Sequence, residues 1–262
     1  MHTLRVVRAF LAVGVLNIVQ YRSDFVIAVL NAVVNLVTQL LGLSVIFTNT
    51  ADLRGWTPDD LLILIGVHFF ISGLVGLVVR PSMEALMEGI RLGTFDYTLT
   101  KPADAQLLAS VRVFAPQSLT DVVVGTGIIA VGIARTGRGL GAAEVLLFLV
   151  TLLAGFATVY GFLLLLSTMA FWFVRLDNIL VIFQALFGNA GRWPVGIFPG
   201  WMRPVLTFVV PIAFAVTVPA QALTGSLSVT GALTSVGVAV LFLVASRAFW
   251  LVALRRYTGA SA

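Results

Sequence analysis

Residues 61–79 read LLILIGVHFFISGLVGLVV, and residues 80–110 continue as RPSMEALMEGIRLGTFDYTLTKPADAQLLAS. The first stretch is almost wholly apolar and approaches the length of about 20 residues that a helix needs to cross the hydrocarbon core of a membrane. The second stretch is a sizeable polar segment that ends where another apolar run begins. This junction predicts a membrane-spanning helix that delivers a polar segment to one side of the membrane.

The composition of the whole chain indicates an integral membrane protein. Of 262 residues, 60% are hydrophobic and 10% are charged, and the mean hydropathy is +1.07. Soluble domains carry about 25% charged residues, so this composition excludes a soluble fold. The net charge of +5 indicates basic residues held on one membrane face rather than a nucleic-acid surface, and no nucleic-acid partner is expected. The absence of cysteine excludes disulfides and thiolate chemistry.

Six apolar runs predict an all-α integral membrane protein with a single transmembrane domain over residues 1–262. Backbone polar groups cannot stay unpaired in lipid, so each run is expected to be a helix. A helix lying in the membrane interface is predicted over residues 1–22, although a plain cytoplasmic lead-in is the alternative. The six runs are Phe25–Phe47, Leu61–Val79, Val111–Ile133, Val145–Val174, Asn178–Val195 and Val229–Leu254.

The distribution of basic residues predicts the orientation of these spans. When both termini are placed in the cytoplasm, 11 of the 16 Lys and Arg residues fall on the cytoplasmic side. The reverse topology would invert this count, against the excess of Lys and Arg that cytoplasmic loops carry. The residues then expected outside are Arg54, Arg135, Arg138, Arg192 and Arg203. The polar segment 80–110 is therefore expected in the cytoplasm.

The segment at residues 196–224 is expected to dip into the outer leaflet and return. Five of the nine prolines lie between Pro194 and Pro219, and proline breaks helices. The stretch is nonetheless apolar, so it needs cover from protein at membrane depth. One kinked spanning helix is the alternative, but it would place Arg255 and Arg256 outside.

Sparse polar residues within the spans are candidates for lining a translocation pathway. Intramembrane polar side chains usually face the protein interior or water, but they can also serve as hydrogen bonds between helices, and the sequence leaves both readings open. Asp121 is the costliest of the polar groups to bury, and Arg112 and other nearby cations are its candidate partners. The pathway candidates are Asn31, Asn35, Gln39, His68, Gln184 and Asn189.

The polar segment is predicted to contain a short amphipathic helix. Ser82 can cap such a helix, and Met83, Leu86, Met87 and Ile90 recur at helical spacing. An exposed apolar stripe of this kind suits a groove on a partner protein, or alternatively the lipid headgroups. The chain has no GxxxxGK[ST] phosphate loop and no HExxH or GxSxG motif, so it carries no nucleotide-binding or hydrolytic signature of its own.

At this segment the chain resembles a known family. The order Glu88-Gly89-Ile90, Gly93, Phe95-Asp96, Leu99 and Lys101-Pro102, placed between the second and third spans, is similar to that of ABC-2 type transporter permeases. The six-span layout, the basic N-terminal helix and the proline-rich apolar stretch before the last span are also similar to a bacterial branch of this family. The resemblance therefore extends over nearly the whole chain.

The resemblance implies a permease subunit of an ATP-driven exporter in a bacterial cell membrane. It implies two ATP-binding cassette subunits and a second ABC-2 type permease, homologous or identical, as partners, together with membrane lipid. It implies no cofactor in this chain, since ATP and Mg would sit on the partner subunit. It also implies that segment 80–110 is a coupling helix, with these docking residues: Met83, Glu84, Met87, Glu88, Gly89, Gly93, Phe95, Asp96, Leu99, Lys101 and Pro102.

Two other functions stay open at this stage. A membrane-embedded lipid-modifying enzyme would use His68, Asp121 or Glu144 as its acid–base group. A substrate-binding subunit of an energy-coupling-factor importer would hold a small molecule, but such proteins are usually smaller and lack this loop. An apolar interior with sparse amides suits a lipid, a lipophilic drug or an amphipathic peptide better than an ion.

Overall fold

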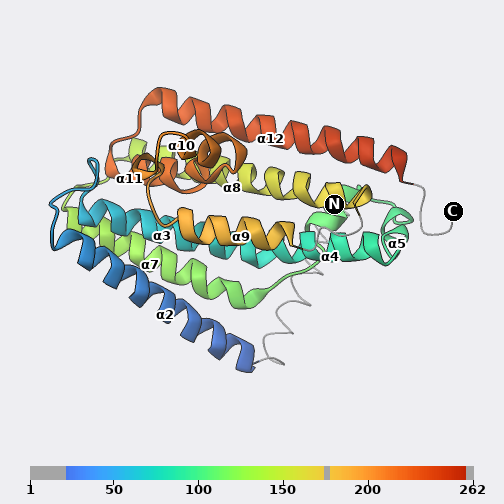
Figure 1. Ribbon diagram of the computed structural model, residues 1–262, viewed down its shortest axis with the longest axis horizontal. Coiled ribbons are helices and arrows are strands. Elements are labelled where there is room, and N and C mark those ends of the chain that lie inside the picture. Colours follow the sequence, from blue (N-terminus) through green and yellow to red (C-terminus); the bar gives the residue numbers. More distant parts are fainter. Residues whose placement is uncertain (1–21, 174–177, 258–262) are drawn as a thin grey trace.

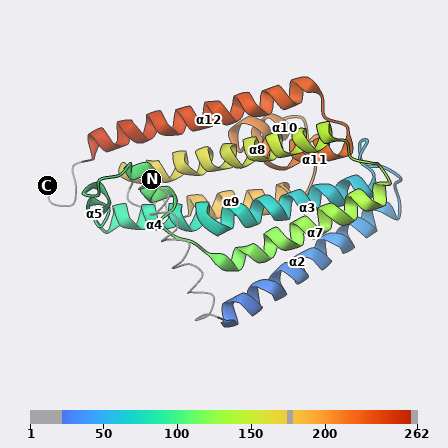
Figure 2. The same cartoon turned by 180° about the vertical axis from the view of Figure 1, so that it is seen from behind.

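The computed structural model describes residues 22–173 and 178–257, which are helical and contain no β-strand. The interfacial helix predicted at residues 1–22 falls almost entirely outside these residues. Long helices run side by side along the long axis of the molecule, and short segments join them at its two ends (Figures 1 and 2).

The helices follow one another along the chain with short connections. The segments longer than ten residues are α2 (Arg22–Phe47), α3 (Pro58–Leu74), α4 (Arg80–Arg91), α7 (Leu119–Thr136), α8 (Ala142–Thr168), α9 (Ile179–Ala190) and α12 (Val229–Arg256). Between them lie η1 (Val75–Val79), α5 (Asp96–Leu99), α6 (Ala105–Ser110), η2 (Pro116–Ser118), η3 (Met169–Phe171), η4 (Val195–Ile197), α10 (Met202–Pro204), η5 (Val205–Val209), η6 (Ala213–Thr217) and α11 (Val218–Thr224).

Among the described residues, five helices are long and apolar enough to cross a membrane. They are Phe25–Phe47, Pro58–Arg91, Pro116–Thr136, Ala142–Phe171 and Val229–Arg256. The span predicted at Asn178–Val195 was too long, because the helix there is α9, with only 12 residues. At 1.5 Å per residue it reaches about 18 Å, short of a hydrocarbon core of about 30 Å. The third span also begins later than the predicted Val111, at Pro116.

Helices α3, η1 and α4 form one uninterrupted rod rather than a span followed by a loop. Thr57 begins it with a capping box, in which its side chain accepts from the Asp60 amide while Asp60 accepts from the Thr57 amide. The prediction that Ser82 starts a separate helix was wrong. Ser82 is fully buried, and its hydroxyl both donates to the Val113 carbonyl and accepts from the Val113 amide, each at 3.1 Å. It fastens the rod to the chain that leads into α7.

Glycines let α3 and α7 approach at backbone contact. A Cβ placed on Gly125 of α7 would lie 2.5 Å from the Phe70 amide nitrogen, and one on Gly66 of α3 would lie 2.8 Å from the Ile129 amide nitrogen. Small residues at helix contacts are the usual means of packing helices in membranes, where lipid tails provide no hydrophobic drive for association.

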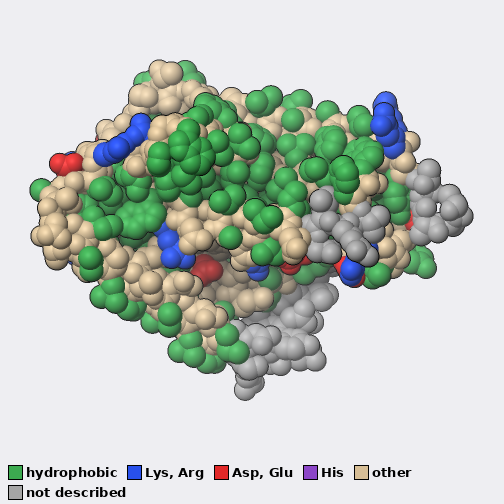
Figure 3. Space-filling view, in the orientation of Figure 1, with side chains coloured by type: hydrophobic (Ala, Val, Ile, Leu, Met, Phe, Trp, Pro, Cys, Tyr) green, Lys and Arg blue, Asp and Glu red, His purple; other side chains and the backbone are tan. Residues whose placement is uncertain are grey.

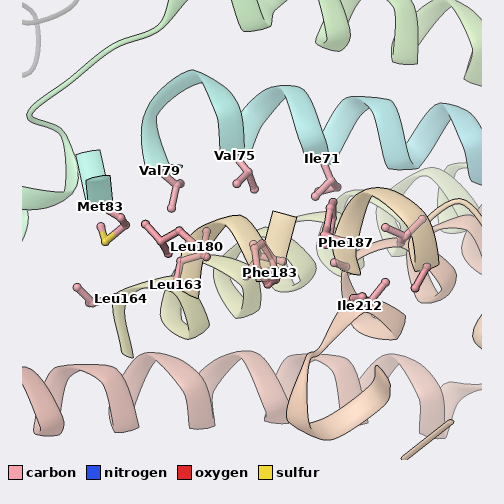
Figure 4. Packing of buried hydrophobic residues seen from close by; sticks show 14 of the residues in the cluster. Ile71, Val75, Val79, Met83, Leu163, Leu164, Leu180, Phe183, Phe187 and Ile212 are labelled. Atoms are coloured by element: carbon pink, nitrogen blue, oxygen red, sulfur yellow. The ribbon is translucent and has the colours of Figure 1, made fainter. Parts of the chain in front are cut away.

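The buried core lies where α3, η1, α4, α8 and α9 meet. Figure 4 shows Ile71, Val75, Val79 and Met83 along one rod, facing Phe187, Phe183 and Leu180 of α9 and Leu163 and Leu164 of α8. The order of the residues shows that α9 runs antiparallel to α3. Although it is too short to span a membrane alone, α9 is therefore an integral part of the packed bundle.

The proline-rich segment is broken in its middle. Helices Met202–Val209 and Ala213–Thr224 are bent by 75° at a short break. Arg54, in the α2–α3 turn, donates to the carbonyl of Gly196 at 2.7 Å, and Arg138, between α7 and α8, donates to that of Thr224 at 2.6 Å. The segment therefore begins and ends near the same end of the molecule, opposite α5.

Candidate functional site

Residues 80–110, which we call the tip, lie at the end of the molecule where α8 and α12 terminate (Figure 1). The tip consists of α4, α5 and α6. Gly93 separates the first two helices with a left-handed φ of +71°, a conformation that favours glycine. Lys101 and Pro102 then interrupt the helix, and Asp104 caps α6 by accepting from the Leu107 amide.

The apolar stripe of α4 packs inside the protein. Met83 and Leu86 are essentially inaccessible, and Met87 is 7% exposed. These side chains belong to the main core, against α8 and η3. The chain itself covers the apolar stripe of α4, so these side chains are not available as the docking face that their periodicity predicted.

Phe95 fixes the tip to the ends of two long helices. It is 1% exposed, and its ring meets Phe171, Trp250 and Tyr257 edge-on, with centroids 5.5, 5.9 and 5.8 Å away. Edge-to-face pairs at these separations are favourable because the positive ring edge meets the negative ring face. Phe95, predicted as a docking residue, thus lies in an aromatic cluster formed by the tip, η3 and the C-terminal end of α12.

Two further polar contacts join the tip to α12. Arg247 pairs with Asp104 at 2.7 Å and also donates to the Gln106 side chain at 2.8 Å. The hydrogen bond from Arg247 lowers the pKa of Asp104. Nearby, burial and then the neighbouring Asp96 carboxylate raise the pKa of Tyr257 to about 12. Asp96 of the motif therefore faces the end of α12.

The outer surface of the tip is apolar as well as charged. Leu92, Tyr97 and Leu99 are exposed, Tyr97 by 74%. Leu99 was among the predicted docking residues because it belongs to the motif at residues 88–102, whereas Leu92 and Tyr97 are not motif positions. Gly89 packs near the Arg112 guanidinium. The remaining predicted docking residues on the exposed surface are Glu84, Glu88, Lys101 and Pro102.

A second feature is a cavity of about 240 Å³ beside the central part of the rod. Four of the six pathway candidates line it, from three helices: Asn35, Gln39, His68 and Gln184. Asn31 is exposed on α2 outside the cavity, and Asn189 donates to the carbonyl of Ala185 in its own helix. The structure thus brings together side chains that the sequence could only place on separate spans.

His68 is held tightly in the wall of this cavity. It is 5% exposed, its ring stacks on Phe187 with centroids 5.5 Å apart, and its Nε2 lies 3.2 Å from the Phe187 carbonyl oxygen. Because a carbonyl only accepts, this contact places a proton on Nε2 and leaves Nδ1 as an acceptor in the neutral ring. Among the described residues, no hydrogen-bond donor reaches Nδ1.

Three charged residues also line the cavity: Arg80, Asp121 and Arg192. Among the candidate cations, Asp121 interacts electrostatically with Arg80 and not with Arg112. The reason is that Arg112 lies before α7, beside Gly89 of the tip. Arg80 also lies 3.6 Å from Glu84. Arg192 forms no ion pair with any described carboxylate.

The residues suggested for lipid chemistry do not assemble into one site. Glu144 caps α8 by accepting from the Gly141 amide. It therefore serves a helix end, whereas His68 and Asp121 line the cavity. Over the part of the chain that the structure describes, no group of His, Cys, Asp and Glu side chains could hold a metal ion.

Several long apolar helices define a multi-pass membrane protein. A sequence model described as ABC-2 family transporter protein matches residues 33–261. The chain belongs to this family, as the motif at residues 88–102 predicted. Permeases of this family generally partner with ATP-binding subunits. No curated protein and no solved structure matches the chain.

Proposed function

We propose that the chain is the membrane subunit of an ATP-driven exporter and forms half of its translocation pathway. It would assemble with a second ABC-2 permease, identical or homologous, and with two ATP-binding subunits that hold ATP and Mg. The observation that carries the proposal is the combination of an internal polar cavity with an exposed tip that is fixed to the long helices around it.

The arrangement of basic residues supports a tip that faces the cytoplasm of a bacterial cell. Positive residues gather at the tip and at the end of α12, where Arg255 and Arg256 follow the last span. At the opposite end, Arg135 of α7 pairs with Asp59 in the first turn of α3 at 2.8 Å. An excess of Lys and Arg marks the cytoplasmic side of membrane proteins. The bent segment at residues 196–224 then belongs to the outer leaflet.

The attachments of the tip support a role in coupling. Phe95 packs against η3 and α12, and Asp104 pairs with Arg247 of α12. A displacement of the exposed surface around Tyr97 would therefore move the ends of α8 and α12 together. In this proposal the ATP-binding subunit contacts Leu92, Tyr97 and Leu99, and the buried Met83, Met87 and Phe95 transmit the motion.

A pair of alanine variants tests this contact. Tyr97 on the tip and Trp201 at the opposite end are 74% and 73% exposed, so replacing either costs little packing. We expect Tyr97→Ala to weaken binding of the ATP-binding subunit by about tenfold, because exposed aromatic side chains are frequent interface hot spots worth more than 1 kcal/mol. Trp201→Ala should leave that binding unchanged.

The measurement is ATPase activity of the complex, purified through a tag on the permease and reconstituted in lipid. Association is scored by the amount of copurified subunit that carries a phosphate loop. If no such subunit copurifies with the unmodified chain, or if both variants retain it equally, the proposed coupling surface is wrong.

A further inference from the structure

The charge balance within the cavity differs between its two ends. Arg80 and His68 are twelve residues apart on one rod, so about 18 Å separates them along its axis. At the tip end, Asp121 and Glu84 balance the positive charge of Arg80. At the far end, Arg192 lies near His68, and no described carboxylate pairs with it. One end of the cavity is therefore electrically balanced and the other carries a positive charge.

An unpaired cation at this position has an energetic cost. The guanidinium of arginine stays protonated in proteins, so Arg192 keeps its positive charge inside the cavity wall. Intramembrane charges usually pair with one another or face a substrate pathway. Arg192 lines the cavity, and its Nε has no hydrogen-bond partner among the described residues. A bound anion would supply the missing partner.

The surroundings of Arg192 resemble a built site more than a surface arginine. His68 and Gln39 are more than nine-tenths buried, and the His68 Nδ1 and Gln39 Oε1 lack partners. A Cβ on Gly191, next to Arg192, would lie 2.7 Å from the His68 ring, so the chain there is held against the histidine. A head group with both negative oxygens and a donor, such as a singly protonated phosphate, satisfies Arg192 and these two acceptors, whereas a carboxylate satisfies Arg192 alone.

The remaining wall of the cavity is apolar. Phe187, Phe183 and Leu180 of α9 line it in this order from the His68 end toward the tip. Its volume of about 240 Å³ is below the roughly 300–1,000 Å³ of ordinary small-molecule sites. A larger ligand must therefore extend out of it between α2 and α9, where α9 exposes the apolar Val181 on the same face as its cavity-lining Gln184 and Gly188. Figure 3 shows this face, with charged atoms among hydrophobic ones between the two helices.

We propose that the far end of the cavity binds the acidic head of an amphiphile, a carboxylate or a phosphate, and that Arg192 selects for its negative charge. The inference rests on the proposed function, since it assigns a substrate class to the same pathway. The apolar wall receives the first part of the chain, and the rest lies along the membrane-facing surface. A free anion could bind Arg192 in the same way as the acidic head, but it would make no contact with the apolar wall.

The test compares an acid with its neutral ester. The purified full-length chain in neutral detergent is titrated with cis-parinaric acid and with its methyl ester, and energy transfer from tryptophan measures binding. Because the ester has no negative charge, its signal measures how much of the probe enters the micelle or binds apolar protein surface. The variants are Arg192→Gln, Arg192→Lys and, as a matched control outside the cavity, Arg54→Gln.

We expect the acid to bind the unmodified chain more tightly than the ester does. Arg192→Gln should weaken acid binding by about tenfold, equivalent to about 1.4 kcal/mol, without affecting the ester. Arg192→Lys should retain most of the acid affinity, and Arg54→Gln should change neither ligand. Equal affinities for acid and ester, or an equal loss of both in Arg192→Gln, would overturn the inference.

A competition experiment separates an amphiphile from a free anion. Dodecyl phosphate should displace the bound acid, and inorganic phosphate should not. Displacement by inorganic phosphate at similar concentration would overturn the assignment to an amphiphile. These measurements need no ATP-binding subunit, so their failure leaves the coupling proposal intact, and failure of copurification leaves the binding result intact.

Discussion

Phe95 and Tyr97 lie two residues apart on the tip, but the structure gives them opposite environments. Phe95 is 1% exposed and Tyr97 is 74% exposed. Replacing each with alanine removes an aromatic ring of similar size. The two variants therefore separate the stability of the tip from its contact with a partner.

The loss of stability expected for Phe95→Ala follows from the burial of the Phe95 side chain. Truncating a buried Phe to Ala costs about 3–5 kcal/mol, and the three edge-on rings around Phe95 place this site well within that range. A chain of this size shifts its melting temperature by about 2–4 °C per kcal/mol, so we expect a drop on the order of 10 °C. For Tyr97→Ala, the melting temperature should stay within about 2 °C, because surface substitutions usually change stability by less than 0.5 kcal/mol.

The assay is thermal unfolding in detergent, followed by tryptophan fluorescence and by the recovery of monodisperse protein after heating. Trp250 belongs to the Phe95 cluster, so its emission reports the loss of packing directly. ATPase coupling is measured on the same preparations below the melting temperature. Equal melting temperatures for the two variants would refute the aromatic cluster as an anchor of the tip.

Two further predictions test the packing and the charge contacts. Gly125→Ala should lower stability by about 1–3 kcal/mol, because its Cβ would meet the Phe70 backbone at 2.5 Å, whereas Gly127→Ala, with open space around it, should be neutral or slightly stabilising in the same thermal assay. Asp104→Asn keeps the helix cap but removes the charge that pairs with Arg247. Since the folded-state pKa of Asp104 is lowered, the pair stabilises the protein above the unfolded pKa of about 3.9 and is lost as pH falls through the folded value. The variant should therefore be slightly less stable than the unmodified chain at neutral pH, by under about 1 kcal/mol because both side chains are half-exposed. The difference in melting temperature should disappear in acid. A difference that persists in acid would contradict the ion-pair account.

Apolar run length predicted most of the helical fold because a membrane leaves few alternatives for the backbone. It failed at α9, where the apolar composition continues beyond Ala190 although the helix does not. The capping prediction failed at Ser82, because a hydroxyl that can cap a helix can equally well form a buried contact with the Val113 backbone. Periodicity identifies an apolar stripe but does not say which surface covers it, and for Met83 and Met87 the covering surface is the chain itself.

The cavity was predictable only in part. Spacing placed polar residues on one face of a helix, and Asn35, Gln39, His68 and Gln184 do meet. The contribution of Arg192 was not visible, because the residue was counted among the cations outside the membrane and not among the pathway candidates. Its place beside His68 depends on the antiparallel packing of α9 against α3, which no local pattern encodes.

The most direct test of the coupling account uses the fact that the chain has no cysteine. Single-cysteine variants Tyr97→Cys and Trp201→Cys are treated with a short thiol-to-amine crosslinker in membranes that contain the full transporter. The account predicts that Tyr97→Cys crosslinks to the ATP-binding subunit, with a yield that changes when ATP is added, and that Trp201→Cys does not. A crosslink to that subunit from position 201, or none from position 97, would contradict it.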